Sequence, residues 1–230
     1  MKTKILAIFA CLLWGSAFAG AKIGFEYTTP LHLSGMRFML AGLLLIPFLI
    51  YQKIDWISNL KEWRYMLLFG FLQTFIQYGF FFMGLNKVPA AISAIIIGGG
   101  PFFVAVMAHF TMGNDRMSFR KILAIVLGMA GIVFISFAKG GSIHTDISFY
   151  YGVILLIISN IVGASTNIIV AKNRNKVSPV MLTAFANFSG GLILYIVSFF
   201  TEDWYVKPYS LEFYIAWIWL ALIPADGFSI

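Results

Sequence analysis

The stretch GFEYTT at residues 24–29 follows the first apolar run of the chain, and NRNKVS at residues 173–178 occupies the equivalent place 149 residues later. The flanking sequences also agree, since GLLL at residues 42–45 matches GLIL at residues 191–194. The chain therefore contains a weak internal repeat whose equivalent loops have opposite charge. In a membrane protein, this pattern predicts two copies of one unit inserted in opposite orientations, as in many secondary transporters.

The composition also favours a membrane protein. Hydrophobic residues make up 60% of the chain, charged residues 11%, and the mean hydropathy is +0.89. A soluble domain of this length needs a more charged surface. The net charge of +7 does not indicate a nucleic-acid partner, because the basic residues stand singly between apolar runs. The single cysteine, Cys11, excludes an intrachain disulfide framework, and we expect no metal and no cofactor.

The apolar runs predict an all-α membrane protein with seven complete spanning helices and part of an eighth. These runs lie at residues 5–23, 30–51, 65–85, 88–111, 120–138, 150–171 and 179–200, and the eighth begins near Phe213. Five spans precede the second copy, and an odd number inverts it, in agreement with the loop charges. The predicted domains are a five-helix repeat at residues 1–139 and a second, inverted and incomplete repeat at residues 147–230.

The distribution of Lys and Arg predicts a cytoplasmic N-terminus in a multi-pass protein of the cell membrane. With this orientation, eleven basic residues face the cytoplasm and four face outward. The N-terminus has an alternative interpretation, because Lys2, Lys4 and the apolar residues 5–13 resemble a secretory signal peptide. We favour a retained span, because the apolar run continues to Ile23 and has a partner in the repeat.

Five polar residues lie inside predicted spans and are candidate substrate-binding residues: Arg37, Gln73, Gln77, Asn160 and Asn167. A charge inside the bilayer is costly, so Arg37 either lines a polar cavity or anchors its helix at the outer surface. Each amide pair has spacing that places it on one helix face. For the amides, the alternative to a substrate cavity is hydrogen bonding between packed helices.

Small residues at four-residue spacing predict close helix packing in three spans. They are Ser16, Gly20 and Gly24 in the first span, Ala124 and Gly128 in the fifth, and Ala186 and Gly190 in the seventh. The run GGGP at residues 98–101 has no following Lys, so it predicts a kinked or flexible helix rather than a phosphate-binding loop.

Enzyme signatures such as GxSxG, HExxH, the P-loop and CxxC do not occur in the sequence, so we expect a protein that is not an enzyme and has no catalytic residues. A membrane-embedded lipid-modifying enzyme is the alternative from another class. That enzyme would need a polar cluster at one membrane face, whereas the polar residues are scattered through span interiors.

Several short motifs together resemble the EamA-type members of the drug/metabolite transporter superfamily. They are Leu13-Trp14-Gly15-Ser16, Pro30, Arg37-Phe38 with Ala41, Gly84-Leu85 before Val88-Pro89-Ala90, Pro101-Phe102, and Gly128 with Gly131. The resemblance implies a carrier with ten spans in two inverted five-helix repeats, which moves small metabolites or organic solutes, amino-acid-like or drug-like, by alternating access. It adds Trp14 and Ser16 to the candidate substrate-binding residues.

The length of the chain departs from this family pattern. An offset of 149 residues implies roughly 290 residues for two copies, whereas the sequence has 230. We expect a C-terminally truncated chain, which as it stands could be non-transporting, in preference to a homodimer whose second copy completes the missing wall. The expected partners are a small-molecule substrate and membrane lipid.

Overall fold

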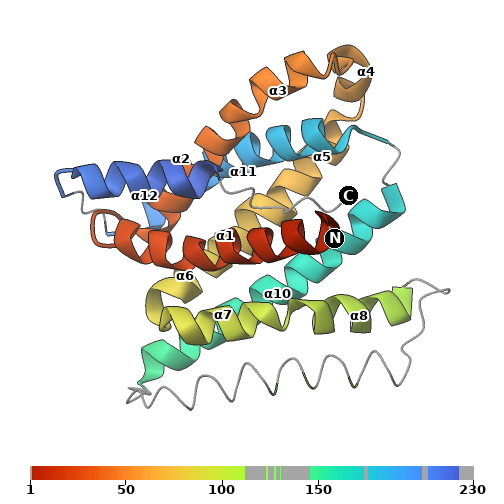
Figure 1. The fold of residues 1–230 in the computed structure, drawn as a ribbon. Coiled ribbons are helices and arrows are strands. Elements are labelled where there is room, and N and C mark those ends of the chain that lie inside the picture. Colours follow the sequence, from red (N-terminus) through yellow and green to blue (C-terminus); the bar gives the residue numbers. More distant parts are fainter. Residues whose placement is uncertain are drawn as a thin grey trace. The chain divides into compact units, whose positions relative to one another are not determined.

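The computed structural model describes residues 2–111, 146–173, 176–203 and 207–222, together with Leu123, Leu127 and Ala130. Every regular element in these residues is helical (Figure 1). The elements are α1 (Lys2–Gly24), α2 (Pro30–Leu44), α3 (Ile46–Tyr51), α4 (Trp56–Leu60), α5 (Trp63–Phe69), the π-helix η1 (Gly70–Gln77), α6 (Tyr78–Lys87), α7 (Ala90–Gly98), α8 (Gly100–Thr111), α10 (Ile147–Asn173), α11 (Pro179–Thr201) and α12 (Leu211–Leu222).

Five helical stretches in the described residues are long and apolar enough to cross a membrane. They are Pro30–Tyr51, Trp63–Lys87, Ala90–Thr111, Ile147–Asn173 and Pro179–Thr201. α12 is a shorter apolar helix. The prediction of an all-α membrane protein is therefore confirmed, whereas the full number of spans stays a prediction. The span expected at residues 120–138, with the pair Ala124 and Gly128, lies outside the described residues.

Proline and glycine determine where these helices begin and break. α2 and α11 each have proline in the first turn, where the missing N–H has no partner to lose. α2 ends at Leu44 and α3 begins at Ile46, because Pro47 cannot donate a backbone hydrogen bond within the helix. The break expected in the GGGP run is confirmed, since α7 ends at Gly98 and α8 begins at Gly100.

The chain forms two compact units, and each is described by itself. Unit 1 contains Met1–Phe75 and Asn175–Ile230, and unit 2 contains Ile76–Arg174. In unit 1, α2 packs along α11, α5 also contacts α11, and α12 packs against both α1 and α2 (Figure 1). In unit 2, α10 packs against α6, α7 and α8. These helix pairs position all the polar side chains considered below.

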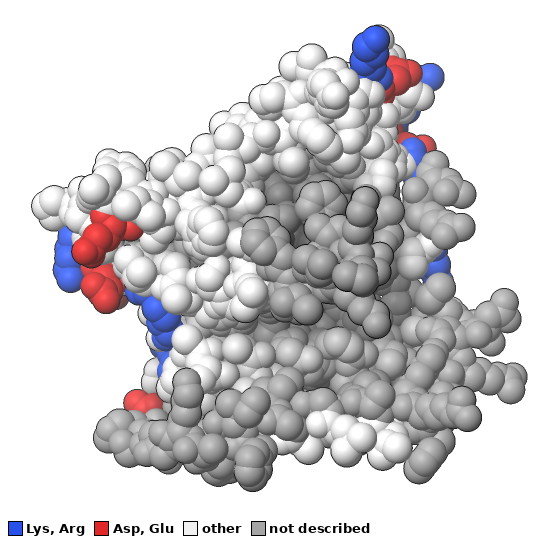
Figure 2. Space-filling model, in the orientation of Figure 1, with Lys and Arg blue, Asp and Glu red and all other residues white. Residues whose placement is uncertain are grey.

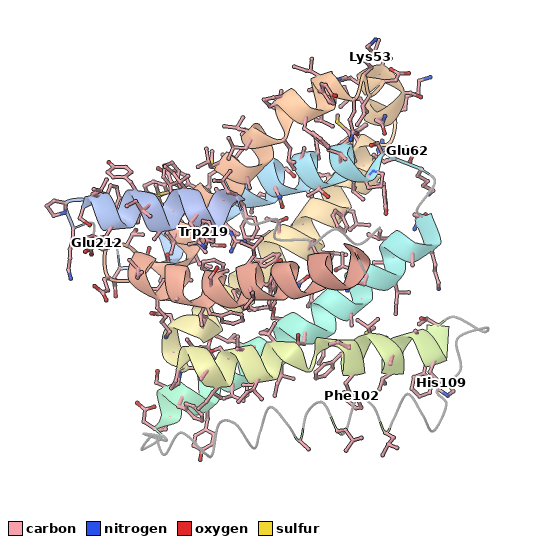
Figure 3. The ribbon with its side chains drawn as sticks, in the orientation of Figure 1. Lys53, Glu62, Phe102, His109, Glu212 and Trp219 are labelled. Carbon is pink, nitrogen blue, oxygen red and sulfur yellow. The ribbon has the colours of Figure 1, made fainter. Side chains whose placement is uncertain are left out.

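The surface of unit 1 has its charges at the ends of its helices. Figure 2 shows Lys, Arg, Asp and Glu gathered near the α3–α4 end and near the start of α12, with uncharged residues between them. Lys53, Glu62 and Glu212 mark these ends in Figure 3. Large apolar side chains such as Phe48, Ile50 and Ile215 are exposed between them. An apolar band with charged ends is the surface expected of a protein in a bilayer.

Candidate functional site

The predicted site residues belong to different units. Trp14, Ser16, Arg37 and Gln73 lie in unit 1, whereas Gln77, Asn160 and Asn167 lie in unit 2. The structure therefore forms two separate groups of candidate residues, each positioned by its own helices. We describe the group in unit 2 first, because its hydrogen bonds are the more complete.

The side-chain amide of Gln77 packs against α10 at Gly163. A Cβ atom at Gly163 would lie 2.7 Å from Gln77 Nε2 and 2.8 Å from Gln77 Cδ, so the amide lies directly on the helix backbone. The Ser159 hydroxyl donates a hydrogen bond to the Gln77 carbonyl oxygen at 2.9 Å. Polar groups at the end of η1 and on α10 thus meet within an otherwise apolar contact, where interhelical hydrogen bonds hold helices together.

Asn160 connects α10 to the break between α7 and α8. Its Nδ2 donates a 2.6 Å hydrogen bond to the carbonyl oxygen of Ile96, and its side chain is buried. Its Oδ1 would lie 3.3 Å from a Cβ atom at Gly100. The Ile96 carbonyl also accepts from the Gly99 N–H at 3.2 Å, so Asn160 supplies it with a second donor. This contact fits the packing role that we considered as the alternative to substrate binding.

Asn167 lies two turns further along α10, and its side chain is exposed on the surface of the described structure. It does not share the buried environment of Asn160, although seven-residue spacing places both near one face. Gln77 thus contacts Ser159 and Gly163, which lie beside Asn160 on α10, whereas Asn167 is not part of this group. A substrate-binding role for these three residues stays a prediction.

Trp14 and Ser16 lie on α1, whose last turns pack against α12. The Trp14 and Phe18 rings form an edge-to-face pair with centroids 5.5 Å apart. The Ser16 hydroxyl donates to the Leu13 carbonyl oxygen at 2.6 Å and accepts from Trp219 Nε1 at 3.0 Å. Trp219 lies on the side of α12 that faces α1 (Figure 3). Ser16 thus contributes to the contact between these two helices.

The small-residue packing predicted for the first span is confirmed by its neighbours. A Cβ atom at Gly20 would lie 3.4 Å from Leu220 on α12, and one at Gly24 would collide with the Leu33 side chain on α2. The pair in the seventh span behaves in the same way, since Ala186 contacts Gly70 and Gly190 contacts Thr74. In each case the small side chain lets two helix backbones come close.

Arg37 is buried in unit 1, with 4% of its surface exposed. Its guanidinium carbon lies 4.6 Å from the centroid of the Phe38 ring, which is a favourable position for a cation over an aromatic face. Of the two roles considered for Arg37, an anchor that extends to the outer surface does not fit this burial. Gln73, at 7% exposure, is buried in the same unit on η1.

α2 and α11 cross at glycines, with their backbones in contact. A Cβ atom at Gly42 would lie 2.8 Å from the Ala184 carbonyl oxygen and 2.8 Å from the Phe188 nitrogen. A Cβ atom at Gly191 would lie 2.8 Å from the Met39 nitrogen and 3.1 Å from the Gly35 carbonyl oxygen. Gly42, near the end of α2, contacts Ala184 in the first half of α11, whereas Gly35, earlier in α2, contacts Gly191 further along α11. The two helices are therefore antiparallel.

Each end of this helix pair has a side chain from another segment that binds its backbone amides, Glu202 at the end of α11 and Asn59 on α4. At the start of α2, the Glu202 carboxylate accepts hydrogen bonds from the backbone N–H groups of Leu31 at 3.0 Å and His32 at 3.3 Å. At the start of α11, Asn59 Oδ1 accepts from the Ser178 N–H at 2.7 Å. Both side chains satisfy helix-end amides that have no partner within their own helix.

Sequence reasoning missed Asn187 and Thr74, which are both buried in unit 1 at exposures of 2% and 0%. Asn187 lies in the middle of the seventh predicted span, so the criterion applied to Asn160 would have found it. Thr74 follows Gln73 in η1. The π-helical form of this segment had no sequence signal that we recognised, and such turns occur frequently at functional sites.

Comparisons with known proteins agree with this membrane fold. Residues 1–137 match the model of the EamA-like transporter family. The uncharacterized transporter YvbV of Bacillus subtilis is 25% identical over 221 residues, which cover 96% of this chain and 70% of that protein. A probable amino-acid metabolite efflux pump of Escherichia coli is 29% identical over 133 residues, which cover 57% of this chain and 42% of that protein.

A solved crystal structure has the same fold, with a TM-score of 0.75 and 18% identity, and the match covers 96% of this chain and 74% of that one. The relatives named above are transporters and not enzymes, and the matched family is a transporter family. The chain is therefore a multi-pass membrane protein of transporter type. Its family model covers more than half of its length, and the chain belongs to the EamA-like transporter family.

Proposed function

We propose that this protein is a carrier that moves small polar metabolites across the cytoplasmic membrane by alternating access between two inverted repeats. The proposed repeats are residues 1–139 and 147–230. In carriers of this kind, the substrate binds near the middle of the membrane, at the interface of the repeats. The observation that carries the proposal is the way in which α2 and α11 contact each other.

The contacts between α2 and α11 are reciprocal under the 149-residue offset. Adding 149 to Gly42 gives Gly191, and subtracting 149 from Ala184 and Phe188 gives Gly35 and Met39. The contacts of Gly42 with Ala184 and Phe188 therefore become contacts of Gly191 with Gly35 and Met39, which are the ones observed. A pair of equivalent antiparallel helices related by a local two-fold axis would produce this exchange, as inverted repeats require.

The other helix pairs support the same relation. In unit 1, Gly20 on α1 faces Ala216 and Leu220 on α12. In unit 2, Gly84 on α6 faces Gly152 and Leu156 on α10. In both units, the two residue numbers of a contacting pair add up to 236 or 240. Exchanging the repeats adds 149 to one number and subtracts 149 from the other, so it does not change this sum. The first span thus packs on the eighth in the same register in which the sixth packs on the third.

The proposed orientation has the N-terminus in the cytoplasm, because eleven of the basic residues then lie on that side. Single cysteines at Lys53 and Arg174, introduced in a Cys11→Ser background, test it. We expect a membrane-impermeant maleimide to label both only when applied from the cytoplasmic side. Labelling of either position from outside intact cells would overturn this orientation.

The proposed substrates are amino-acid-like solutes. A relative is named a probable amino-acid metabolite efflux pump, and the buried candidate residues of unit 1 include a cation, Arg37, and an amide, Gln73. A guanidinium group suits a carboxylate, and amides suit neutral donors and acceptors. The membrane lipid is the second proposed partner, because large apolar side chains are exposed between the charged ends of unit 1.

Reconstitution tests the proposed transport directly. The purified chain in proteoliposomes is exposed to each of the twenty proteinogenic L-amino acids in radiolabelled form, with protein-free liposomes as the control. We expect saturable uptake of at least one amino acid. Uptake of all twenty at the rate of protein-free liposomes would reject amino-acid transport by this chain. Light scattering of the purified chain in nanodiscs measures the oligomeric state and tests the alternative of a homodimer.

A further inference from the structure

The hydroxyl of Thr74 differs from the hydroxyls of Ser189 and Thr201, which lie on α11 in the same unit. Ser189 and Thr201 on α11 donate to the carbonyl oxygen four residues earlier, at 2.7 Å and 2.9 Å. This local bond is the usual way in which a helix satisfies such a side chain. Thr74 Oγ1 is completely buried and has no hydrogen-bond partner among the described residues.

The π-helical turn explains why Thr74 lacks this bond. In η1, backbone hydrogen bonds connect residues five apart, so the carbonyl four residues before Thr74 no longer has its α-helical position. That carbonyl belongs to Gly70, and it would lie 2.6 Å from a Cβ atom at Gly190. The Thr74 side chain contacts Gly190 as well. The Cβ atom and the methyl group of Thr74 therefore lie against α11.

Asn187 lies one turn before this contact on α11. In a helix with 3.6 residues per turn, position 187 falls between positions 190 and 191. Gly190 faces η1, and Gly191 faces α2. Asn187 is thus directed between these two helices, at 2% exposure, and its Oδ1 atom has no hydrogen-bond partner in the described parts of the chain.

Thr74 Oγ1 and Asn187 Oδ1 belong to a larger set of buried side-chain atoms without a hydrogen-bond partner in the described residues, which also includes Ser34 Oγ and Tyr65 OH. An unsatisfied buried acceptor destabilises a folded protein by about 1–3 kcal/mol, and lipid offers no water to replace the missing partner. Polar side chains inside spans mostly occur where they meet a substrate path or another polar group. Thr74 contacts α11 at Gly190, and Asn187 lies one turn earlier on α11, on the side between the positions that face η1 and α2.

We propose that Asn187 and Thr74 bind a hydrogen-bond-donating group of the carried solute, such as an amino or hydroxyl group. Asn187 Oδ1 can only accept hydrogen bonds, so its ligand supplies an N–H or O–H group. The Thr74 hydroxyl can donate or accept, so it adapts to either ligand. This inference rests on the proposed transport function, and it names the solute group that the site recognises.

Cysteine accessibility tests whether this crossing opens to solutes, and it requires no known substrate. Asn187→Cys and Thr74→Cys are made in the Cys11→Ser background and treated in membrane vesicles with aminoethyl methanethiosulfonate. Leu194→Cys is the matched control, because Leu194 is fully buried on α11 and purely apolar. Size-exclusion chromatography checks that all three variants are folded.

We expect the cysteines at positions 187 and 74 to react at least about tenfold faster than the one at position 194, because a minor open conformation, even at a population of about 0.1–10%, would expose them to the reagent. Reaction of both at the rate of the control would overturn the inference. This result does not depend on transport. An inactive wild-type chain with reactive cysteines would contradict the proposed function alone, and an active chain with unreactive cysteines would contradict this inference alone.

Transport by conservative variants then tests the chemistry of the ligand. With the amino acid found in the proteoliposome panel, Asn187→Leu is expected to raise KM about tenfold, since it removes one buried hydrogen bond. Asn187→Asp retains the acceptor and is expected to keep KM within about twofold of the wild type, or to lower it, since a carboxylate accepts hydrogen bonds more strongly. Equal KM values for wild type and Asn187→Leu would exclude a hydrogen bond from the solute to this side chain.

Discussion

α2 and α11 occupy equivalent places in the two halves of the sequence, yet they bury different side chains. Both begin at a proline, and their backbones touch at Gly42 and Gly191. Where α2 has Arg37 and Phe38, α11 has Ala186 and Asn187 at the corresponding numbers. The backbone contact is thus common to both helices, whereas the buried side chains at corresponding positions differ in charge and polarity. The proposed solute path thus has a cation on one side and an amide on the other.

The variants Gly42→Ala and Gly191→Ala should show the largest effect, which is a loss of stability. Each added Cβ would lie 2.8 Å from backbone atoms of the other helix, and such overpacking destabilises by about 1–3 kcal/mol. Thermal unfolding in detergent measures both variants. Gly15→Ala is the control, because nothing in the described structure lies within 4 Å of that Cβ. A large decrease in unfolding temperature for one variant and no decrease for the other would show that the two helices do not pack equivalently.

Arg37→Ala should reduce transport more than Lys87→Ala does. Arg37 is buried beside Phe38, whereas Lys87 is exposed at the end of α6. We expect about a tenfold lower kcat/KM for Arg37→Ala, which corresponds to about 1.4 kcal/mol. The proteoliposome assay measures both variants. Equal activities would assign Arg37 to structural support and leave Asn187 as the distinctive polar group.

The side chains that bind the two ends of the α2–α11 pair should contribute differently to the stability of the protein. Glu202 accepts from two backbone N–H groups of α2, and Asn59 accepts from one N–H group at the start of α11. Removing a capping side chain costs about 0.5–2 kcal/mol, so Glu202→Ala should lower the unfolding temperature more than Asn59→Ala. Glu202→Gln, which keeps an acceptor, should fall between wild type and Glu202→Ala. A larger decrease in unfolding temperature for Asn59→Ala than for Glu202→Ala would show that the charge of Glu202 does not strengthen the capping of α2.

Asn160→Ala should have the smallest effect. It removes one hydrogen bond to the Ile96 carbonyl oxygen, and interhelical bonds in membranes contribute about 0.6 kcal/mol on average. This change belongs to unit 2, so the α2–α11 contact should remain intact. Thermal unfolding checks the magnitude, and transport should stay within about twofold of wild type. A complete loss of transport with normal stability would instead make Asn160 a substrate-binding residue.

The sequence predicted the features that depend on hydrophobicity and on local breakers. Pro30, Pro179 and the GGGP run lie where helices begin or break. It did not predict η1, because a π-helical turn depends on the close fit of Gly70 to α11 rather than on residue propensity. Nor did it assign Glu202, since a carboxylate in a loop gives no indication of a helix end 171 residues away.

The capping of α2 by Glu202 has a consequence for biosynthesis. The amides of Leu31 and His32 enter the membrane early, but their carboxylate partner is separated from them by about 170 residues. At ribosomal rates of about 5–20 residues per second, the start of α2 waits many seconds for that partner. α2 therefore completes its fold only after α11 has been inserted, which makes the assembly of this helix pair a late step on the ribosome.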